Sequence, residues 1–203
     1  MFRVRQSAVL LFGVLLSACG GGEKARLANP NTSYLPATGP LATVQTPAEN
    51  YDAISYWDGD GVQGPPSVII YLSEQRAYFY KGDQLVGVSQ VSAGREGHDT
   101  PAGKYKIMQK DKDHASNLYG DYVDGAGNVV QSNVEAGKDP KPPGAVFKGA
   151  PMPFFMRITG GVGMHEGYLP GYPASHGCIR MPGRMAQIYF SNVSLGTPVT
   201  IVK

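Results

Sequence analysis

The sequence predicts a mostly β fold of the sandwich or barrel-like type, with one or two short helices and a long insertion loop. Short runs of β-branched and aromatic residues recur along residues 65–203 and are separated by glycine-containing turns. Only one segment places apolar residues at helical spacing. Many short strands with abundant glycine are typical of sandwiches and barrels, so this fold class is expected.

Four strands are predicted in the first part of this region. Ser67–Leu72 is a β-branched and aromatic run, and Ala77–Tyr80 is an aromatic run that ends at the turn Lys81-Gly82-Asp83. Leu85–Val91 then alternates apolar residues with small or polar ones, as a half-buried strand does. Lys104–Met108 continues in the same style.

The second part is predicted to hold two further strands and the helix. Phe154–Thr159 forms a strand that leads into a glycine-rich turn, and Pro198–Val202 is the closing strand. The helix is placed after Pro182, because proline suits the first turn of a helix and apolar residues then recur at helical spacing. These residues are Met185, Ile188 and Tyr189.

Residues 109–153 separate these two parts and are expected to be a long insertion loop. The segment is rich in aspartate, lysine, glycine, asparagine and proline, with three prolines at 140, 142 and 143. A loop of this length in a compact domain is usually a functional lid or a disordered insertion. A lid over the site and a passive surface loop both remain open.

The first 18 residues are predicted to be a signal peptide. Arg3 and Arg5 form a positive start, and the apolar run of residues 8–16 is too short to span a bilayer comfortably. The small residues before Cys19 resemble a bacterial lipobox, in which this cysteine becomes the lipidated first residue. The alternatives are an ordinary signal peptide cut elsewhere and an N-terminal anchor that is not cut.

Residues 19–64 are predicted to be a lipidated N-terminus and a flexible tether, followed by a catalytic domain at residues 65–203. Glycine, proline, serine, threonine, asparagine and alanine dominate the tether, which makes it extended and weakly structured. The cluster Tyr51–Trp57 either remains in the tether or docks on the domain as an extra strand.

Charge excludes one class of partner. Arg3 and Arg5 account for two of the 18 basic residues, so the remainder balances the 16 acidic residues. No basic run is present, which argues against a nucleic-acid partner. The lipid would supply the membrane attachment, and a monomer is expected.

The chemistry of the chain centres on Cys178. It is the only cysteine apart from Cys19, so a lipidated Cys19 leaves it without a disulfide partner. His165 precedes it by 13 residues and is a candidate base, since a thiol needs help to become a nucleophilic thiolate. The helix predicted after Pro182 would favour the thiolate through its N-terminus. Gly177 permits close approach of a carbonyl, which makes the Gly177 and Cys178 amides candidates for an oxyanion hole.

Two stretches of the sequence resemble the L,D-transpeptidases, the YkuD-domain enzymes of bacterial cell-wall metabolism. The first runs from His165-Glu166-Gly167 to Pro173-Ala174-Ser175-His176-Gly177-Cys178-Ile179-Arg180-Met181-Pro182. The second is Ser92-Ala93-Gly94 with the following segment from His98 to Tyr105, which is similar to the family's Thr-Pro-x-Gly-x-aromatic motif. Phe155-Met156-Arg157-Ile158 is likewise similar to a strand of the better-known members, so the resemblance covers roughly residues 66–203.

The resemblance implies a cysteine acyltransferase that acts on peptidoglycan stem peptides and needs no cofactor or metal. Cys178 would attack the carbonyl of the third residue of a tetrapeptide stem and expel the terminal D-alanine. An amine would then take the acyl group, giving a 3–3 cross-link, an anchored protein or an exchanged D-amino acid. His165 would be the general base and acid. The acceptor is left open.

The resemblance also implies roles for the neighbours of this pair. The backbone carbonyl of Glu166 would orient His165, although glycine, serine or asparagine is expected at this position. The Glu166 carboxylate would raise the pKa of His165. His176 would line the substrate side, Ser175 and Gly177 would support the cysteine, and Arg180 would brace the loop or meet a substrate carboxylate.

For several of these residues, a different site or a purely structural role is the alternative. His165, His176 and Cys178 have the residue types of a zinc site, but the sequence offers no fourth ligand nearby. His98 and His114 are expected to be solvated loop histidines, and the segment Thr100–Gly103 a turn without chemistry. Tyr119 and Tyr122 either stack on the substrate or only pack.

The rival functions are a hydrolase of the same fold and a non-catalytic peptidoglycan-binding lipoprotein. A binding module has no need of an activated thiol beside a histidine. The expected location is the periplasmic side of the envelope. Because Gly20 and not aspartate follows Cys19, the outer membrane is favoured.

Overall fold

The computed structural model describes Asp52 and residues 54–203, which belong to one compact unit. The predicted signal peptide, the lipidation site Cys19 and most of the tether lie outside these residues. The part that is described contains no helix with the length and apolar character required to cross a membrane.

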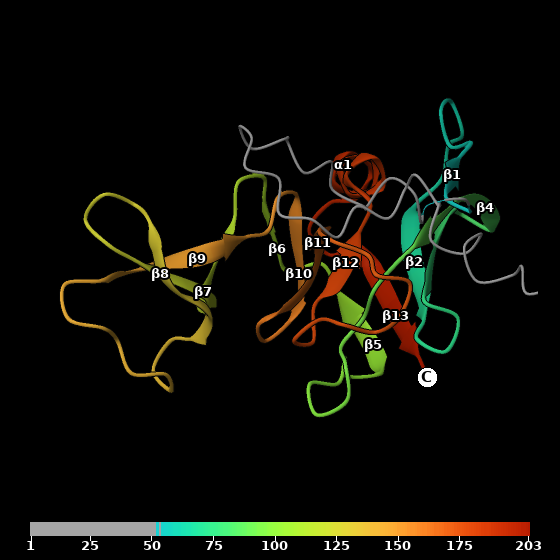
Figure 1. The fold of residues 1–203 in the computed structure, drawn as a ribbon. Coiled ribbons are helices and arrows are strands. Elements are labelled where there is room, and N and C mark those ends of the chain that lie inside the picture. The colour runs from blue at the N-terminus through green and yellow to red at the C-terminus, as the bar shows by residue number, and fades with distance from the viewer. Residues whose placement is uncertain (1–51, 53) are drawn as a thin grey trace, which may run out of the picture. The chain divides into compact units, whose positions relative to one another are not determined.

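Three β-sheets and one helix make up this unit, which confirms the mostly β fold class (Figure 1). The six-stranded sheet has the order β1-β4-β3-β2-β13-β5. Its strands are β1 (Tyr56–Trp57), β2 (Pro66–Tyr71), β3 (Arg76–Lys81), β4 (Gln84–Gln90), β5 (Gly103–Lys106) and β13 (Pro198–Val202). Every strand predicted before residue 109 is present in it.

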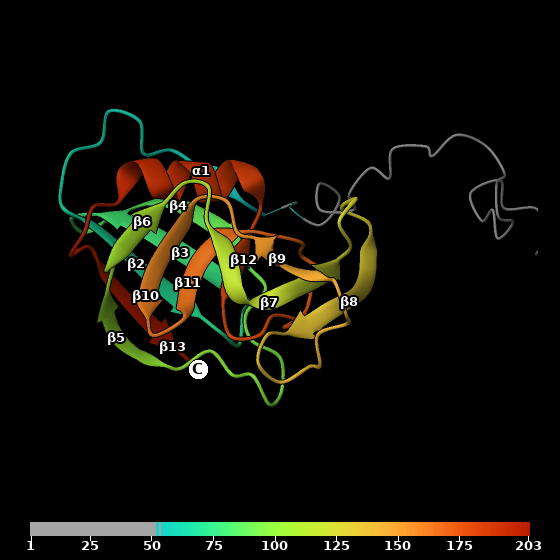
Figure 2. The same ribbon diagram turned by 90° about the vertical axis from the view of Figure 1, so that its left-hand side faces the viewer.

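The second sheet has four strands in the order β12-β11-β10-β6, and Figure 2 shows them side by side. They are β6 (Gln109–Asp111), β10 (Phe155–Thr159), β11 (Val162–Glu166) and β12 (Ile179–Met181). Strands β10 and β11 are antiparallel, whereas β11 and β12 are parallel. The motif region, in which no strand was predicted, therefore contains β12.

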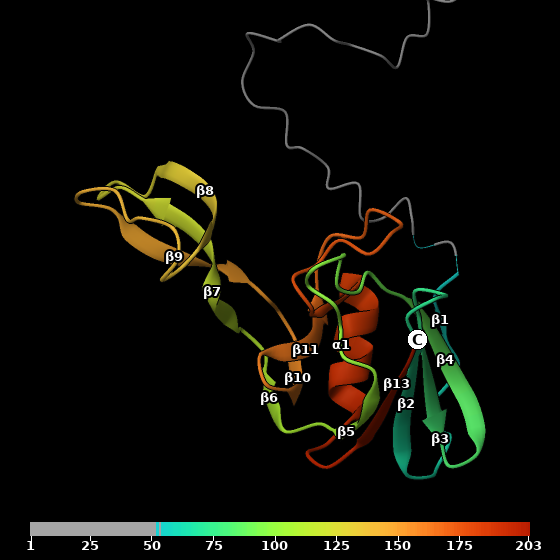
Figure 3. The same ribbon diagram turned by 90° about the horizontal axis from the view of Figure 1, so that it is seen from below.

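The helix α1 (Gly183–Asn192) connects the two sheets through their shared core (Figure 3). It begins directly after Pro182, as predicted. Met185, Ala186 and Tyr189 are buried, and α1 contacts β10 and β11. Tyr189 reaches the other sheet: its hydroxyl donates a hydrogen bond to the Ala77 carbonyl at 2.8 Å and its ring packs edge-on against Phe79.

The prediction of a long loop at residues 109–153 was wrong. After β6, this segment forms a third sheet of order β8-β7-β9, here called the insertion sheet (Figures 1 and 3). Its strands are β7 (Ala115–Val123), β8 (Val129–Glu135) and β9 (Val146–Pro151), and its small core consists of Tyr122, Val134 and Ala145, with Phe147 packed against them.

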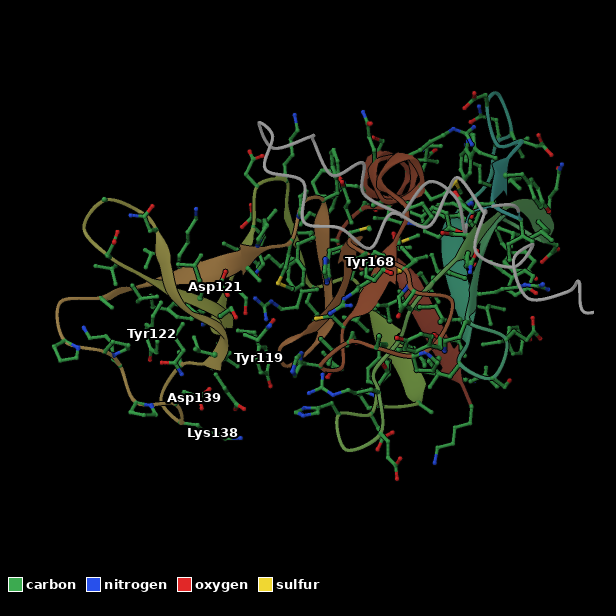
Figure 4. The ribbon with its side chains drawn as sticks, in the orientation of Figure 1. Tyr119, Asp121, Tyr122, Lys138, Asp139 and Tyr168 are labelled. Atoms are coloured by element: carbon green, nitrogen blue, oxygen red, sulfur yellow. The ribbon has the colours of Figure 1, made fainter. Side chains whose placement is uncertain are left out.

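The polar and glycine residues that suggested a loop have structural roles in this sheet. The carboxylates of Asp121 and Asp139 accept hydrogen bonds from the amides of Asn133 and Glu135 (Figure 4). A side chain at Gly149 would collide with the carbonyl of Ser116, so glycine is required where β7 and β9 approach closely.

Residues before 65 also join the folded unit. Tyr56 and Trp57 of β1 pair with Val88 and Gly87 of β4, and the Trp57 ring packs edge-on against Phe79 at 5.2 Å. Of the two alternatives for this cluster, docking as an extra strand is therefore the one observed for Tyr56 and Trp57.

The substitution Tyr189→Phe tests the link between α1 and the six-stranded sheet. The substitution removes the hydroxyl that donates a hydrogen bond to the Ala77 carbonyl, and both residues are fully buried. Because the carbonyl then has no partner, the free energy of unfolding should fall by about 1 to 2 kcal/mol. Urea unfolding measures this change. Tyr172→Phe is the matched control, since this side chain is 61% exposed, and an equal loss in both variants would contradict the link.

Candidate active site

The four-stranded sheet has an apolar face and a functional face. Alternate residues of its strands point into the core beside α1, namely Met156, Ile158, Met164, Ile179 and Met181. The residues between them lie on the opposite face. The candidate catalytic side chains therefore project from the face that the core does not use.

Strand register places Cys178 in a row with two residues of other strands. Arg157 of β10 is the partner of Gly163 on β11, and Met164 is the partner of Ile179 on β12. Cys178 directly precedes Ile179, so it lies beside Gly163, whose backbone makes a hydrogen bond with its sulfur. The first row on this face is Arg157, Gly163 and Cys178.

A second row lies one side-chain repeat further along the strands. His165 of β11 is the partner of Arg180 on β12. On the other side, the pairing of Met156 with Met164 places Phe155 beside His165, with ring centroids 6.3 Å apart. The register therefore places His165 of β11 one side-chain repeat along from Cys178, which directly precedes β12.

His165 is held in one orientation by the backbone of the next residue. Its Nδ1 donates a hydrogen bond to the Glu166 carbonyl at 2.7 Å, which assigns the proton to Nδ1 and leaves Nε2 with a free lone pair. Burial lowers the pKa of His165 to about 4, although the Glu166 carbonyl acts in the opposite direction. Arg180 lowers it further. His165 is therefore a neutral imidazole near pH 7.

The expected effect of the Glu166 carboxylate on His165 was wrong. The carboxyl group lies beside Gly183, where a side chain would come within 3.0 Å of its carbon. Gly183 is the first residue of α1, and a carboxylate is favoured at a helix N-terminus. The Glu166 carboxylate therefore lies at the N-terminus of α1, while its backbone carbonyl accepts the hydrogen bond from His165.

Cys178 combines burial with nearby positive charge. Its sulfur lies 3.5 Å from the Gly161 carbonyl. Burial raises the pKa of the Cys178 thiol, while the Gly163 hydrogen bond and the guanidinium groups of Arg180 and Arg157 lower it by less. The expected stabilisation by the helix N-terminus is not supported, because β12 lies between Cys178 and the start of α1.

Ser175 shapes the loop that carries the thiol. Its hydroxyl donates a hydrogen bond to the Cys178 carbonyl and accepts one from the Gly177 amide at 3.0 Å. The Gly177 amide is therefore already bound, which leaves the Cys178 amide as the candidate oxyanion donor. Gly177 has a φ of +109°, a conformation that favours glycine.

Thr100 ties this loop to the six-stranded side of the molecule. Its hydroxyl donates to the Gly177 carbonyl at 2.8 Å and accepts from the Gly94 amide at 2.9 Å. The side chain is buried, so these two bonds fix the loop below the cysteine. The turn at residues 100–103 thus contributes a positioning residue that the sequence did not reveal.

His176 contacts the insertion sheet through the ring of Tyr119. Arg95 Nη2 donates to its Nε2 at 2.8 Å, its ring stacks on Tyr119 with centroids 4.3 Å apart, and His98 packs edge-on against it. Burial and then Arg95 lower the pKa of His176. His98 was expected to be solvated, but it belongs to this aromatic cluster.

A cavity of about 430 Å³ opens over the two rows. Its floor includes Cys178, His165 and both arginines, and its walls include residues 116–119 of β7, residues 150–152 and Tyr168. Tyr119 comes from the insertion sheet and Tyr168 from the segment after β11 (Figure 4). The insertion therefore forms one wall of the site, and the passive-loop alternative is wrong.

Of the remaining candidates, Tyr122 lies away from the cavity and His114 lines it. Tyr122 only packs, since it lies in the core of the insertion sheet with its hydroxyl on the Asp139 carbonyl. His114, expected to be solvated, lines the cavity: it stacks on Phe155 with centroids 4.2 Å apart, and its Nδ1 lies 3.0 Å from Asp111. Within Asp52 and residues 54–203, no three histidine, cysteine or acidic side chains group closely enough to hold a metal ion.

Residues 65–201 match the family model of the L,D-transpeptidase catalytic domain, YkuD. Solved structures share the fold at low identity. An L,D-transpeptidase from Mycobacterium smegmatis is 18% identical, with a TM-score of 0.50, over 68% of this chain and 59% of that one. An L,D-transpeptidase from Stackebrandtia nassauensis is also 18% identical, with a TM-score of 0.50, over 71% and 60%.

The L,D-transpeptidase LdtMt1, solved in complex with imipenem, is 19% identical, with a TM-score of 0.51, over 68% of this chain and 58% of that one. The chain thus spans about three-fifths of the length of these structures. No curated protein matches the chain in sequence.

Acid should destabilise the protein through His165. Its folded pKa of about 4 lies below the ordinary value of 6.5, so the unfolded chain binds a proton first as the pH falls. This group therefore contributes its full stability above pH 6.5 and loses it on the way to pH 4, by about 2 to 3 kcal/mol. Urea unfolding from pH 7 to pH 4 measures the loss, which His165→Gln should reduce by that amount. Parallel pH profiles would contradict this assignment.

The reactivity of Cys178 should depend on Arg180. In a Cys19→Ser background Cys178 is the only thiol, and its alkylation by iodoacetamide reports the thiolate fraction. Arg180→Gln removes a positive charge that lowers the thiol pKa, so the alkylation rate at pH 8 should fall about 3- to 10-fold. The exposed Arg184→Gln on α1 should leave the rate unchanged. An unchanged rate in Arg180→Gln would show that the charge does not act on the sulfur.

Proposed function

Because the chain belongs to the L,D-transpeptidase catalytic-domain family, YkuD, we propose that it is a cysteine acyltransferase that acts on the tetrapeptide stems of peptidoglycan. The reaction would proceed through a thioester on Cys178. Transfer of the acyl group to an amine would give a 3–3 cross-link, an anchored protein or an exchanged D-amino acid.

The position of Cys178 directly before β12, next to the strand β11 that carries His165, is the observation on which this proposal rests. Both residues line one cavity, and the hydrogen bond from Nδ1 to the Glu166 carbonyl leaves Nε2 as the proton acceptor. A binding protein would gain nothing from a thiol and an oriented imidazole in the same cavity. This geometry therefore favours acyl transfer over a purely binding role.

Acylation begins from an uncharged pair. The pKa of Cys178 is raised and that of His165 is lowered by burial, so thiol and imidazole are both neutral before the substrate binds. As the sulfur attacks the stem carbonyl, its proton passes to His165 Nε2 and the carbonyl oxygen becomes negative. The Cys178 amide is positioned to donate to this oxyanion, since the Ser175 hydroxyl already holds the Gly177 amide.

The tetrahedral intermediate then collapses to the thioester. The C–N bond breaks, and His165 returns its proton to the leaving D-alanine amine. In the second half, the nitrogen of an acceptor amine attacks the thioester and gives a proton to His165. The C–S bond breaks, the sulfur takes that proton back, and the free thiol is restored.

We further propose that Cys19 carries the lipid that anchors the chain on the periplasmic side of the envelope, with the outer membrane favoured. The lipobox-like residues before Cys19 and the glycine after it support this assignment. A monomer is sufficient for the mechanism, since all the proposed groups come from one chain.

Product analysis tests the function directly. The protein is incubated with purified tetrapeptide muropeptides, and the products are separated and weighed. Cross-linked dimers or amine-exchanged stems are expected, with Cys178→Ser reduced at least 1000-fold because the nucleophile is lost. Tripeptide alone would identify a hydrolase, and unaltered muropeptides would favour the binding lipoprotein.

Imipenem supplies an independent test of the nucleophile. LdtMt1, a family member with the same fold, was solved in complex with this β-lactam. Intact mass measurement after incubation should show one imipenem adduct per chain of the Cys19→Ser variant and none on Cys178→Ser. An adduct that survives loss of Cys178 would refute the thioester mechanism.

A further inference from the structure

We propose that Arg157 binds the free C-terminal carboxylate of the acyl donor and so makes the enzyme select stems that end one residue after the bond it breaks. This inference rests on the proposed function and names a specificity-determining residue for it. Arg157 stands outside the motif stretch of residues 165–182 and comes from a different strand, β10.

The strand register places Arg157 and Cys178 on opposite sides of a glycine. Gly163 lies between them in the first row, so their Cα atoms are about two strand spacings apart, roughly 10 Å. Gly163 has no side chain, and the Phe155 ring lies over it, where a Cβ would meet the ring at 2.5 Å. Arg157 and Cys178 both line the cavity, so a peptide segment bound there can extend from the thiol to the guanidinium.

The turn at Gly160 and Gly161 contacts both the Arg157 guanidinium and the Cys178 sulfur. The Nη1 of Arg157 donates to the Gly160 carbonyl at 2.6 Å, and the Cys178 sulfur lies 3.5 Å from the carbonyl of the next residue, Gly161. In the donor, the terminal carboxylate carbon lies three bonds from the attacked carbonyl carbon, about 3.7 Å when extended, and its oxygens reach about 1 Å further. The leaving residue therefore has the length to reach from the sulfur to the guanidinium.

Arg157 is held by neutral groups and keeps its charge for a ligand. Its Nε donates to Gln109 Oε1 at 2.8 Å, and its guanidinium lies 5.1 Å from the centre of the Phe155 ring. The ion pairs of the described residues join His114 to Asp111 and Lys138 to Glu135, so neither includes this arginine. A guanidinium has five N–H donors, of which these contacts occupy two.

A carboxylate is the ligand that suits such a group. The planar fork of arginine binds both oxygens of a carboxylate, and the interaction is charge-assisted. The leaving D-alanine of a tetrapeptide stem carries a carboxylate at this distance. A stem extended by one residue carries an amide there instead, and its own carboxylate lies about 3.5 Å further away.

The test compares two donors that differ only at this group. A stem tetrapeptide with a free C-terminal carboxylate and the same peptide with a carboxamide are offered to the full chain with an amine acceptor. The unmodified protein should prefer the acid by about 30- to 100-fold in kcat/KM. Arg157→Gln should lose this factor on the acid and stay within about 3-fold of the unmodified protein on the amide. The control Arg184→Gln should match the unmodified protein on both peptides.

An equal loss of Arg157→Gln on both peptides would overturn the proposal, because a structural or purely electrostatic role does not distinguish them. Equal use of both peptides by the unmodified protein would overturn it as well. Failure to turn over either peptide counts against the proposed function. If neither peptide is turned over, calorimetry of the binding of both peptides to Cys178→Ser tests the role of Arg157. Acid-selective binding that disappears in Cys178→Ser/Arg157→Gln supports the role, and any other result refutes it.

Discussion

The register of β11 with its two neighbours determines the position of every reactive group in the cavity. Successive side chains of a strand point to opposite faces, so a slip of one residue would exchange the core face and the functional face. Met164 holds this register from the core side, where it is fully buried beside the methionines of β10 and β12. The same packing that stabilises the domain therefore keeps His165 next to the thiol. One face of the four-stranded sheet packs in the core, and the other face holds the candidate site residues.

The loops around this sheet are fixed by short polar contacts to the backbone. Ser175 and Thr100 hold the backbone of Gly177 from two sides, and the Glu166 carbonyl holds His165. None of these contacts uses a charged side chain, so they do not weaken with salt. The insertion sheet is joined to the cysteine loop differently, through the stacking of Tyr119 on His176. The insertion sheet has only a small core of its own, so its position beside the cavity depends on such contacts.

The sequence predicted the elements whose patterns repeat and missed those whose positions depend on contacts. The strands of the six-stranded sheet follow from β-branched runs, and Cys178 and His165 follow from their motif. The insertion sheet was mistaken for a loop because its glycines and aspartates serve close strand approaches and hairpin turns, which have loop-like compositions. The position of the Glu166 carboxylate depends on where α1 begins in space. The alternation in Phe155-Met156-Arg157-Ile158 contained the signal for Arg157, since a charge between two core residues must face away from the core. The direction of each pKa depends on burial, which a linear pattern does not contain.

The raised pKa of Cys178 has a consequence for the durability of the protein. Peroxides and disulfides attack thiolates much faster than thiols, and the products beyond sulfenic acid are irreversible. A thiol whose pKa is raised by burial presents little oxidisable thiolate near pH 7. The burial that raises the pKa of Cys178 therefore also slows the oxidation of its sulfur.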